Sequence, residues 1–188
     1  SRYERSQSRK EECQVMKRFS DILEAKVATE DLPSIYCDMD EVLCNFMKGA
    51  DHVVGGSFVQ ADKADRWNKI SNTKNFWANL EWMPGAKRLY SFIIRYDAHI
   101  LSAYSKRDAN SRPGKMKWLQ RTDFKRSKIY LVRRDQKQAF AKDSDGEPNV
   151  LIDDYIKNIK EWEAKGGIGI HHTSVPKTIN DLKRLGFK

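Results

Sequence analysis

The sequence contains short apolar runs that stop abruptly at acidic or polar residues, and this feature most constrains the fold. The runs occupy residues 34–37, 98–101, 128–132, 149–152 and, more weakly because two glycines interrupt it, 167–170. Apolar runs of this length indicate buried strands. Segments with helical apolar spacing separate them, at residues 85–96, 113–122, 155–165 and 175–185. This alternation predicts an α/β fold in which a parallel sheet carries helices on both faces.

The length of 188 residues suits one domain with a small appendage. Apolar residues at helical spacing predict an N-terminal amphipathic helix over residues 1–30, and the main domain then covers residues 31–188. Residues 47–82 interrupt the alternation of strands and helices. This segment mixes Trp67 and Phe76 with many polar residues, and it predicts short helices that form a small cap after the first strand.

The composition argues against a membrane protein, because 32% of the residues are charged and no apolar run is long enough to cross a bilayer. The first residues lack the apolar core of a signal peptide, so we expect a cytoplasmic protein. The three cysteines, Cys13, Cys37 and Cys44, form no CxxC pair. They favour reduced thiols and argue against zinc.

The net charge of +9 predicts a surface that attracts anions, such as a nucleotide or a nucleic acid. Basic residues are spread from Arg2 to Lys188 without one dense block. A solvated basic surface therefore explains the charge as well as a dedicated nucleic-acid face does.

Acidic residues follow two of the predicted strands. Alternate residues that leave a strand project to the same side, so Asp38 and Asp40 are expected to point into one site. Parallel strands bring the second pair, Asp153 and Asp154, to the same edge of the sheet. Either pair alone would be ordinary, since Asp is common where strands turn into loops. Together the four carboxylates predict a Mg²⁺ site, because a cation relieves their repulsion and Mg²⁺ prefers oxygen ligands.

These motifs occur in a recognisable order. Ile-Tyr-Cys-Asp-Met-Asp-Glu-Val-Leu at 35–43, Ile-Leu-Ser at 100–102, a downstream Lys and Val-Leu-Ile-Asp-Asp at 150–154 resemble the four motifs of the haloacid dehalogenase superfamily. Lys-Asn-Phe-Trp at 74–77 and Leu-Glu-Trp-Met-Pro-Gly-Ala at 80–86 are similar to the 5'(3')-deoxyribonucleotidases within it. The resemblance spans about residues 35–173 and implies a Rossmann-like sheet with a small helical cap.

The resemblance also implies catalytic roles. Asp38 would be the nucleophile that forms an aspartyl-phosphate, and Asp40 would protonate the leaving oxygen and then activate water. Ser102 would donate a hydrogen bond to the phosphoryl oxygens. Covalent catalysis of this kind replaces one difficult displacement by two easier ones.

Further roles fall to basic residues and to the metal ligands. Lys137 would neutralise charge on the nucleophile and the phosphate, with Lys142 as the rival candidate, and Lys115 is a second candidate for phosphate contact. The ligands of Mg²⁺ would be Asp38, the backbone carbonyl of Asp40, and Asp153 or Asp154.

The substrate is less well defined than the chemistry. Phe46 matches the family's aromatic residue that stacks on the nucleobase, and Trp67 is a candidate for a second stacking face, although both residues are equally suited to a core. Glu41 stands where the family most often has Gly, and residues 47–73 do not reproduce the usual base-recognition residues.

We therefore expect a magnesium-dependent phosphohydrolase that acts on nucleoside monophosphates. If residues 47–80 close over Phe46 as a lid, they would enclose one nucleotide and disfavour a long strand. Two alternatives remain: a phosphatase that acts on nucleic-acid ends, which the positive charge favours, and a basic nucleic-acid-binding protein with a vestigial site.

Overall fold

The computed structural model describes residues 32–188. The amphipathic helix expected over residues 1–30 lies outside this range. The strands are β1 (Ile35–Cys37), β2 (His99–Ala103), β3 (Ile129–Val132), β4 (Val150–Asp153) and β5 (Ile168–His171). The α-helices are α2 (Phe46–Val54), α3 (Lys63–Asn72), α4 (Ala86–Ile93), α5 (Ser111–Leu119), α6 (Ile156–Glu163) and α7 (Val175–Arg184). Four 3₁₀ helices join them: η1 (Trp77–Asn79), η2 (Ile94–Tyr96), η3 (Arg126–Lys128) and η4 (Arg134–Phe140).

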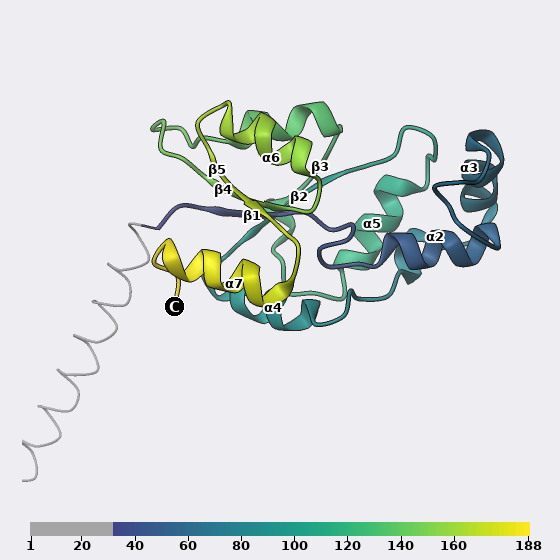
Figure 1. The fold of residues 1–188 in the computed structure, drawn as a ribbon, viewed down its shortest axis with the longest axis horizontal. Helices are drawn as coiled ribbons and strands as arrows, with labels where there is room; N and C mark the ends of the chain where they lie inside the picture. The colour runs from purple at the N-terminus through teal and green to yellow at the C-terminus, as the bar shows by residue number, and fades with distance from the viewer. Residues whose placement is uncertain (1–31) are drawn as a thin grey trace, which may run out of the picture. The chain divides into compact units, whose positions relative to one another are not determined.

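The strands form one parallel sheet in the order β3-β2-β1-β4-β5 (Figure 1). The α/β fold expected from the sequence is therefore confirmed, and the weak run at residues 167–170 is the edge strand β5. The central strand β1 has only three residues, all buried. In the register, Tyr36 of β1 lies opposite His99 of β2 on one side and Leu151 of β4 on the other.

Helices cover both faces of the sheet, with α6 and η4 on one face and α4 and α7 on the other (Figure 1). Successive side chains of a strand point to opposite faces, so every second residue of a strand faces α6 and η4. The apolar core on that face consists of Tyr36, Leu101, Ala141, Leu151, Ile159 and Trp162. No helix within residues 32–188 combines the length and the apolar character needed to cross a bilayer.

The two glycines that weaken the strand signal of β5 allow α6 to pack closely against it. A Cβ atom on Gly167 would lie 2.2 Å from Nε1 of Trp162 and 2.9 Å from the carbonyl oxygen of Ala141. A Cβ atom on Gly169 would lie 2.6 Å from Cγ2 of Ile159. The indole of Trp162 is also fixed by a 3.0 Å hydrogen bond to the carbonyl oxygen of Asn149. Close packing, not a turn, therefore explains these glycines.

The interruption after β1 contains helices, as expected. Residues 47–82 comprise nearly all of α2, the whole of α3 and η1, and Figure 1 shows α2 and α3 beyond the carboxyl ends of the strands. Side chains cap both helices: the Asn45 side chain accepts from the Lys48 amide, and Asp62 accepts from the amides of Ala64 and Asp65. This segment is the small cap of the predicted fold class.

We predict that Gly167→Ala destabilises the protein by about 1–3 kcal/mol, because Trp162 and the backbone of Ala141 leave no space for a methyl group. Chemical denaturation followed by circular dichroism measures the change. Gly56→Ala is the matched control, since a Cβ atom there meets nothing within 4 Å, and we expect it to stay within about 0.5 kcal/mol of wild type. Equal stability of the two variants would contradict this explanation.

Candidate active site

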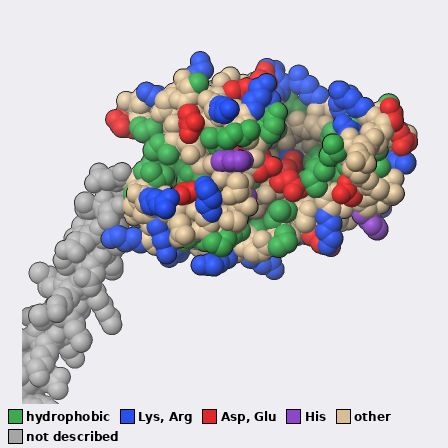
Figure 2. Space-filling view, in the orientation of Figure 1, with side chains coloured by type: hydrophobic (Ala, Val, Ile, Leu, Met, Phe, Trp, Pro, Cys, Tyr) green, Lys and Arg blue, Asp and Glu red, His purple; other side chains and the backbone are tan. Residues whose placement is uncertain are grey.

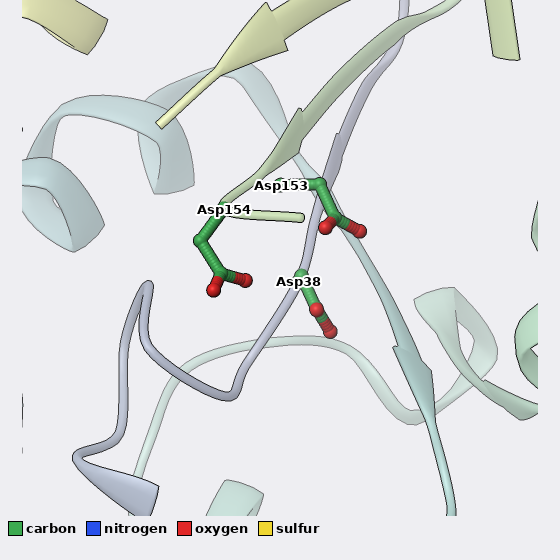
Figure 3. Close-up of side chains that lie close together, drawn as sticks. All are labelled: Asp38, Asp153 and Asp154. Atoms are coloured by element: carbon green, nitrogen blue, oxygen red, sulfur yellow. The ribbon is translucent and has the colours of Figure 1, made fainter. Parts of the chain in front are cut away.

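Three carboxylates meet at the carboxyl edge of the sheet. Asp38 directly follows β1, Asp153 is the last residue of β4, and Asp154 comes next. One oxygen from each carboxylate lies within 4.8 Å of the other two, and Figure 3 shows the side chains grouped at the ends of the two strands. The amide of Asp38 donates to the carbonyl oxygen of Ile152 at 2.9 Å, so the β1–β4 ladder itself fixes their spacing.

A buried lysine lies between two of these carboxylates. Lys137 lies on η4, the 3₁₀ helix that follows β3. Its Nζ is 3.0 Å from Oδ2 of Asp38 and 2.7 Å from Oδ2 of Asp153. Burial disfavours the charged ammonium, but the two carboxylates outweigh this effect and raise the pKa of Lys137. The rival candidate Lys142 is exposed in a turn that pairs with Pro148. The structure thus brings Lys137, and not Lys142, to Asp38.

A second buried lysine holds Asp40. Nζ of Lys115, on α5, is fully buried and donates to Oδ2 of Asp40 at 2.7 Å, to Oγ of Ser102 at 2.9 Å and to the carbonyl oxygen of Ala103 at 2.7 Å. The side chain of Asp40 is therefore not part of the three-carboxylate group. A contribution of Asp40 to a metal site would come from its backbone carbonyl, as the resemblance implies.

The electrostatic environment gives the carboxylates different pKa values. Burial would raise the pKa of Asp38, but the charges of Lys137 and Lys115 outweigh it and lower that pKa below its usual value. Asp154 has no such partner: burial, then the charges of Asp38 and Asp153, raise its pKa to about 7. Asp38 is thus an ionised carboxylate, and a cation beside Asp154 would relieve the repulsion. Oxygen-only ligands of this kind fit Mg²⁺.

The side chain of Asp153 is held by residues that sequence reasoning missed. Nδ2 of Asn158 lies 3.0 and 2.9 Å from its two oxygens, and the amide of Tyr155 donates to Oδ1 at 2.9 Å. Nε2 of His171 donates to the backbone carbonyl of Asp154 at 2.9 Å. Asn158 lies in the first turn of α6, where a short polar side chain can reach back to the strand end, so its spacing from Asp153 could have indicated this contact in the sequence. The contact of His171 could not be predicted from the sequence, because it depends on β4 and β5 being neighbours.

Sequence reasoning gave no role to Trp77 or Asp108, which join the cap segment to the loop before α5. Nε1 of Trp77 donates to Oδ2 of the buried Asp108 at 2.6 Å. The Trp77 ring lies 5.4 Å from Nζ of Lys115 and stacks on Phe46 with ring centroids 5.3 Å apart. Gly114 of α5 permits this contact, since a Cβ atom there would lie 2.5 Å from Cβ of Trp77. Trp77 thus lies between the lysine that holds Asp40 and the aromatic residue proposed to bind a base.

Phe46 belongs to an aromatic cluster in the cap segment. It is partly exposed, and its ring centroid lies 6.4 Å from that of Trp67, with 30° between the ring planes. A base between two rings needs about 7 Å, twice the stacking rise of about 3.4 Å per base. The two rings are therefore too close to enclose a base, and a base that binds here would stack on an outer face of the cluster.

Glu41 stands where the family that the sequence resembles most often has Gly. Its φ of 56° lies in the left-handed region, which costs a non-glycine residue about 1–2 kcal/mol. Its carboxylate accepts a hydrogen bond from the amide of Met47 at 2.7 Å, in the first turn of α2. A carboxylate at a helix N-terminus is stabilising and offsets part of the strain. The backbone that glycine would provide is therefore kept, and the side chain ties α2 to the loop after Asp40.

The described cysteines are packing residues. Cys37 and Cys44 are both buried and form no disulfide. Burial raises the pKa of both thiols well above the ordinary value, so neither is a thiolate that could act as a nucleophile.

Comparison with known proteins gives a structural relationship alone. No family model and no curated protein matches the sequence. A hydrolase from Streptococcus pneumoniae TIGR4, known from its crystal structure, has a similar structure. The TM-score is 0.54 over 81% of this chain and 98% of that chain, at 10% sequence identity. This chain shares the fold of that hydrolase.

We predict that Mg²⁺ affinity falls as pH decreases through about 7, because the carboxyl of Asp154 must then lose a proton to bind the ion. The raised pKa also means that its charge opposes folding of the metal-free protein above that pH. Asp154→Asn should therefore weaken Mg²⁺ binding, flatten its pH dependence and raise the melting temperature of the metal-free protein above pH 7. Isothermal titration calorimetry and thermal melts measure these effects.

Asp145→Asn, in an exposed turn, is the matched control and should change neither quantity. An Mg²⁺ affinity that is constant between about pH 6 and pH 8 would show that Asp154 does not contribute to the ion's site.

Proposed function

We propose that the protein is a magnesium-dependent phosphomonoesterase that hydrolyses nucleoside monophosphates, like the 5'(3')-deoxyribonucleotidases that its sequence resembles. The observation that carries the proposal is the setting of Asp38: a buried carboxylate with a lowered pKa, next to Lys137 and beside Asp153 and Asp154. The likeness of the fold to that of a hydrolase agrees with this chemistry.

In the first step, a carboxylate oxygen of Asp38 attacks the phosphorus atom and the bond from phosphorus to the ester oxygen breaks. The leaving oxygen takes a proton from Asp40, so a neutral alcohol departs and an aspartyl-phosphate remains. The ammonium of Lys115, 2.7 Å from Asp40, fixes the direction of that carboxyl group. Because the lysine also contacts Ser102 at 2.9 Å, it joins the proton donor to the proposed phosphate-binding hydroxyl.

In the second step, Asp40 accepts a proton from water as the water attacks the aspartyl-phosphate. The bond from phosphorus to Asp38 breaks, and inorganic phosphate and the free carboxylate are released. Lys137 and the hydroxyl of Ser102 would stabilise the negative charge on the phosphoryl oxygens in both steps. Bound Mg²⁺, held by Asp38, Asp153, Asp154 and the backbone carbonyl of Asp40, would supply further positive charge at these oxygens.

The aromatic cluster supports a nucleotide as the substrate. Phe46 is partly exposed, and it stacks on Trp77, whose ring lies 5.4 Å from Nζ of Lys115. Stacking on an aromatic face suits every base. The cluster thus favours nucleotides as a class and leaves the base and the sugar open.

We predict that Asp38→Asn abolishes turnover, because the amide has nearly the same shape but is a poor nucleophile. Asp40→Asn should lose roughly 10²–10⁴-fold in kcat and should accumulate the aspartyl-phosphate, because its breakdown lacks a general base. Phosphate release from nucleoside monophosphates with Mg²⁺ and with chelator, together with acid-quench trapping of phosphorylated protein, measures both effects.

Asp145→Asn serves again as the control and should keep full activity. Wild-type turnover by Asp38→Asn would refute the covalent mechanism, and full wild-type activity in excess chelator would remove the metal from it. If no phosphomonoester is hydrolysed by the wild-type protein with Mg²⁺, the vestigial-site alternative replaces the proposal.

We predict that Phe46→Ala raises KM for nucleoside monophosphates about tenfold, because a stacked base contributes about 1–3 kcal/mol. It should leave KM and kcat for glycerol phosphate, which has no ring to stack, within about twofold of wild type. Steady-state kinetics with the two substrates decides the point. An equal loss with both would mean that Phe46 supports the fold of the site and not the base.

A further inference from the structure

The positive charge of the chain is concentrated in one segment. Residues 104–134 contain 11 of the 35 Lys and Arg residues but only 2 of the 26 Asp and Glu residues. The segment therefore has the same net charge as the whole chain, +9, and the remaining residues balance to zero. Basic residues occur throughout the sequence, but the excess of positive charge does not.

This basic segment begins at the candidate active site. It starts two residues after Ser102 and includes the loop 104–110, α5, η3, the edge strand β3 and the first residue of η4. Its chain thus leaves the carboxyl edge of the sheet, crosses to the opposite edge and returns along β3. Figure 2 shows Lys and Arg side chains along the border of a hollow that contains Asp and Glu side chains.

Part of the positive charge of the basic segment is available to a ligand, although some of its cations pair with acids outside it. Its own two acids form no ion pair within residues 32–188: Asp108 is buried and bound to Trp77, and Asp123 accepts a hydrogen bond from the hydroxyl of Tyr90. Several cations are exposed and form no ion pair within residues 32–188; these are Lys106, Arg107, Arg112, Lys117 and Arg126. A surface with unpaired cations at several positions suits a ligand with several phosphates.

Aromatic residues accompany these cations near the site. The guanidinium of Arg112 lies 5.8 Å from the ring of Tyr104. Tyr155, which directly follows the acidic pair, is 51% exposed although it is a large apolar side chain. Cations with aromatic rings nearby are typical of surfaces that bind single-stranded nucleic acid, since bases stack on the rings while phosphates pair with the cations.

We infer that the basic segment binds the sugar–phosphate backbone of a single nucleic-acid strand whose phosphorylated end occupies the site at Asp38. The inference rests on the proposed function and extends its substrate from free nucleotides to strand ends. The lid expected over residues 47–80 does not oppose it, because Phe46 and Trp67 lie on α2 and α3 whereas the unpaired cations lie on the loop 104–110, α5 and η3. The nucleotides next to the phosphorylated end would bind along the basic segment.

The first experiment measures binding and does not depend on activity. Fluorescence anisotropy follows a labelled, 5'-phosphorylated single strand of about 12 nucleotides as it binds the Asp38→Asn variant at increasing salt concentrations. We expect affinity to fall steeply with salt. Adding Lys106→Ala, Arg107→Ala and Arg112→Ala together should weaken binding at least tenfold at low salt. It should also make the plot of log affinity against log salt shallower by about 2, since each lost contact to a single strand removes about 0.7.

Lys87→Ala, Arg88→Ala and Lys183→Ala together form the matched control. These residues are exposed on α4 and α7, so the control removes the same charge from outside the basic segment, and we expect it to bind like the parent. Equal weakening by the two triple variants would overturn the inference, because it would show a general effect of net charge. Tighter binding to phosphatidylserine vesicles than to the strand would overturn it in favour of a membrane surface.

The second experiment measures turnover by the otherwise wild-type protein with Mg²⁺. We expect kcat/KM for 5'- or 3'-phosphorylated strands to rise with length above the mononucleotide value. The 106/107/112 triple variant should lose at least tenfold with strands and less than about twofold with mononucleotides. If mononucleotides are hydrolysed and strands are not preferred, the inference fails while the proposed function stands. If neither is hydrolysed, the proposed function fails, and the binding experiment alone decides what the surface does.

Discussion

The structure depends on the burial of several like charges at one edge of its sheet. Asp38, Asp153 and Asp154 lie within a few ångströms of one another, and water is largely excluded from the first two. Such a group is unfavourable unless positive charge compensates it. Lys137 supplies that charge, since its ammonium contacts both Asp38 and Asp153 from an almost fully buried position. Burial and the remaining negative charge still raise the pKa of Asp153 and raise that of Asp154 to about 7.

A second ion pair, between the buried Lys115 and the partly exposed Asp40, extends this arrangement toward the cap. Lys115 also contacts Ser102, so a side chain that follows β1 and one in β2 share one ammonium group. Buried ion pairs contribute little net stability, because desolvation costs offset the attraction. They do impose geometry: Asp40 and Ser102 cannot move apart without leaving a buried charge unpaired. Trp77, held by Asp108, covers this lysine and joins it to the aromatic cluster of the cap.

The distribution of charge over the protein separates two tasks. Carboxylates gather inside the site, where they would hold a cation and carry out proton and phosphoryl transfer. The excess of cations lies on the neighbouring surface of residues 104–134, where it would attract a polyanion without entering the reaction. Some cations of that segment pair with acids outside it, and the exposed, unpaired ones supply its positive field.

The sequence by itself determined the class of fold and the positions of the strand ends, because both depend on local patterns. Apolar runs that end at Asp38 and Asp153 specify buried strands, and parallel strands place their carboxyl ends at one edge. It did not determine which lysine pairs with which carboxylate. Lys137 and Lys142 are the same residue type and lie five positions apart in the sequence. Only the path of the chain through η4 and beyond it buries Lys137 and exposes Lys142.

The same holds for Asn158, His171 and Trp77, whose contacts join segments that meet only when helices pack on the sheet. Gly167, directly before β5, and Gly169 within it show the limit from the other direction. They weaken the strand signal when read alone, yet they are required because Trp162 and Ile159 pack against them. Local propensity is a property of a few neighbouring residues, whereas close packing and buried charge pairs are settled between distant ones, and only the tertiary structure brings those together.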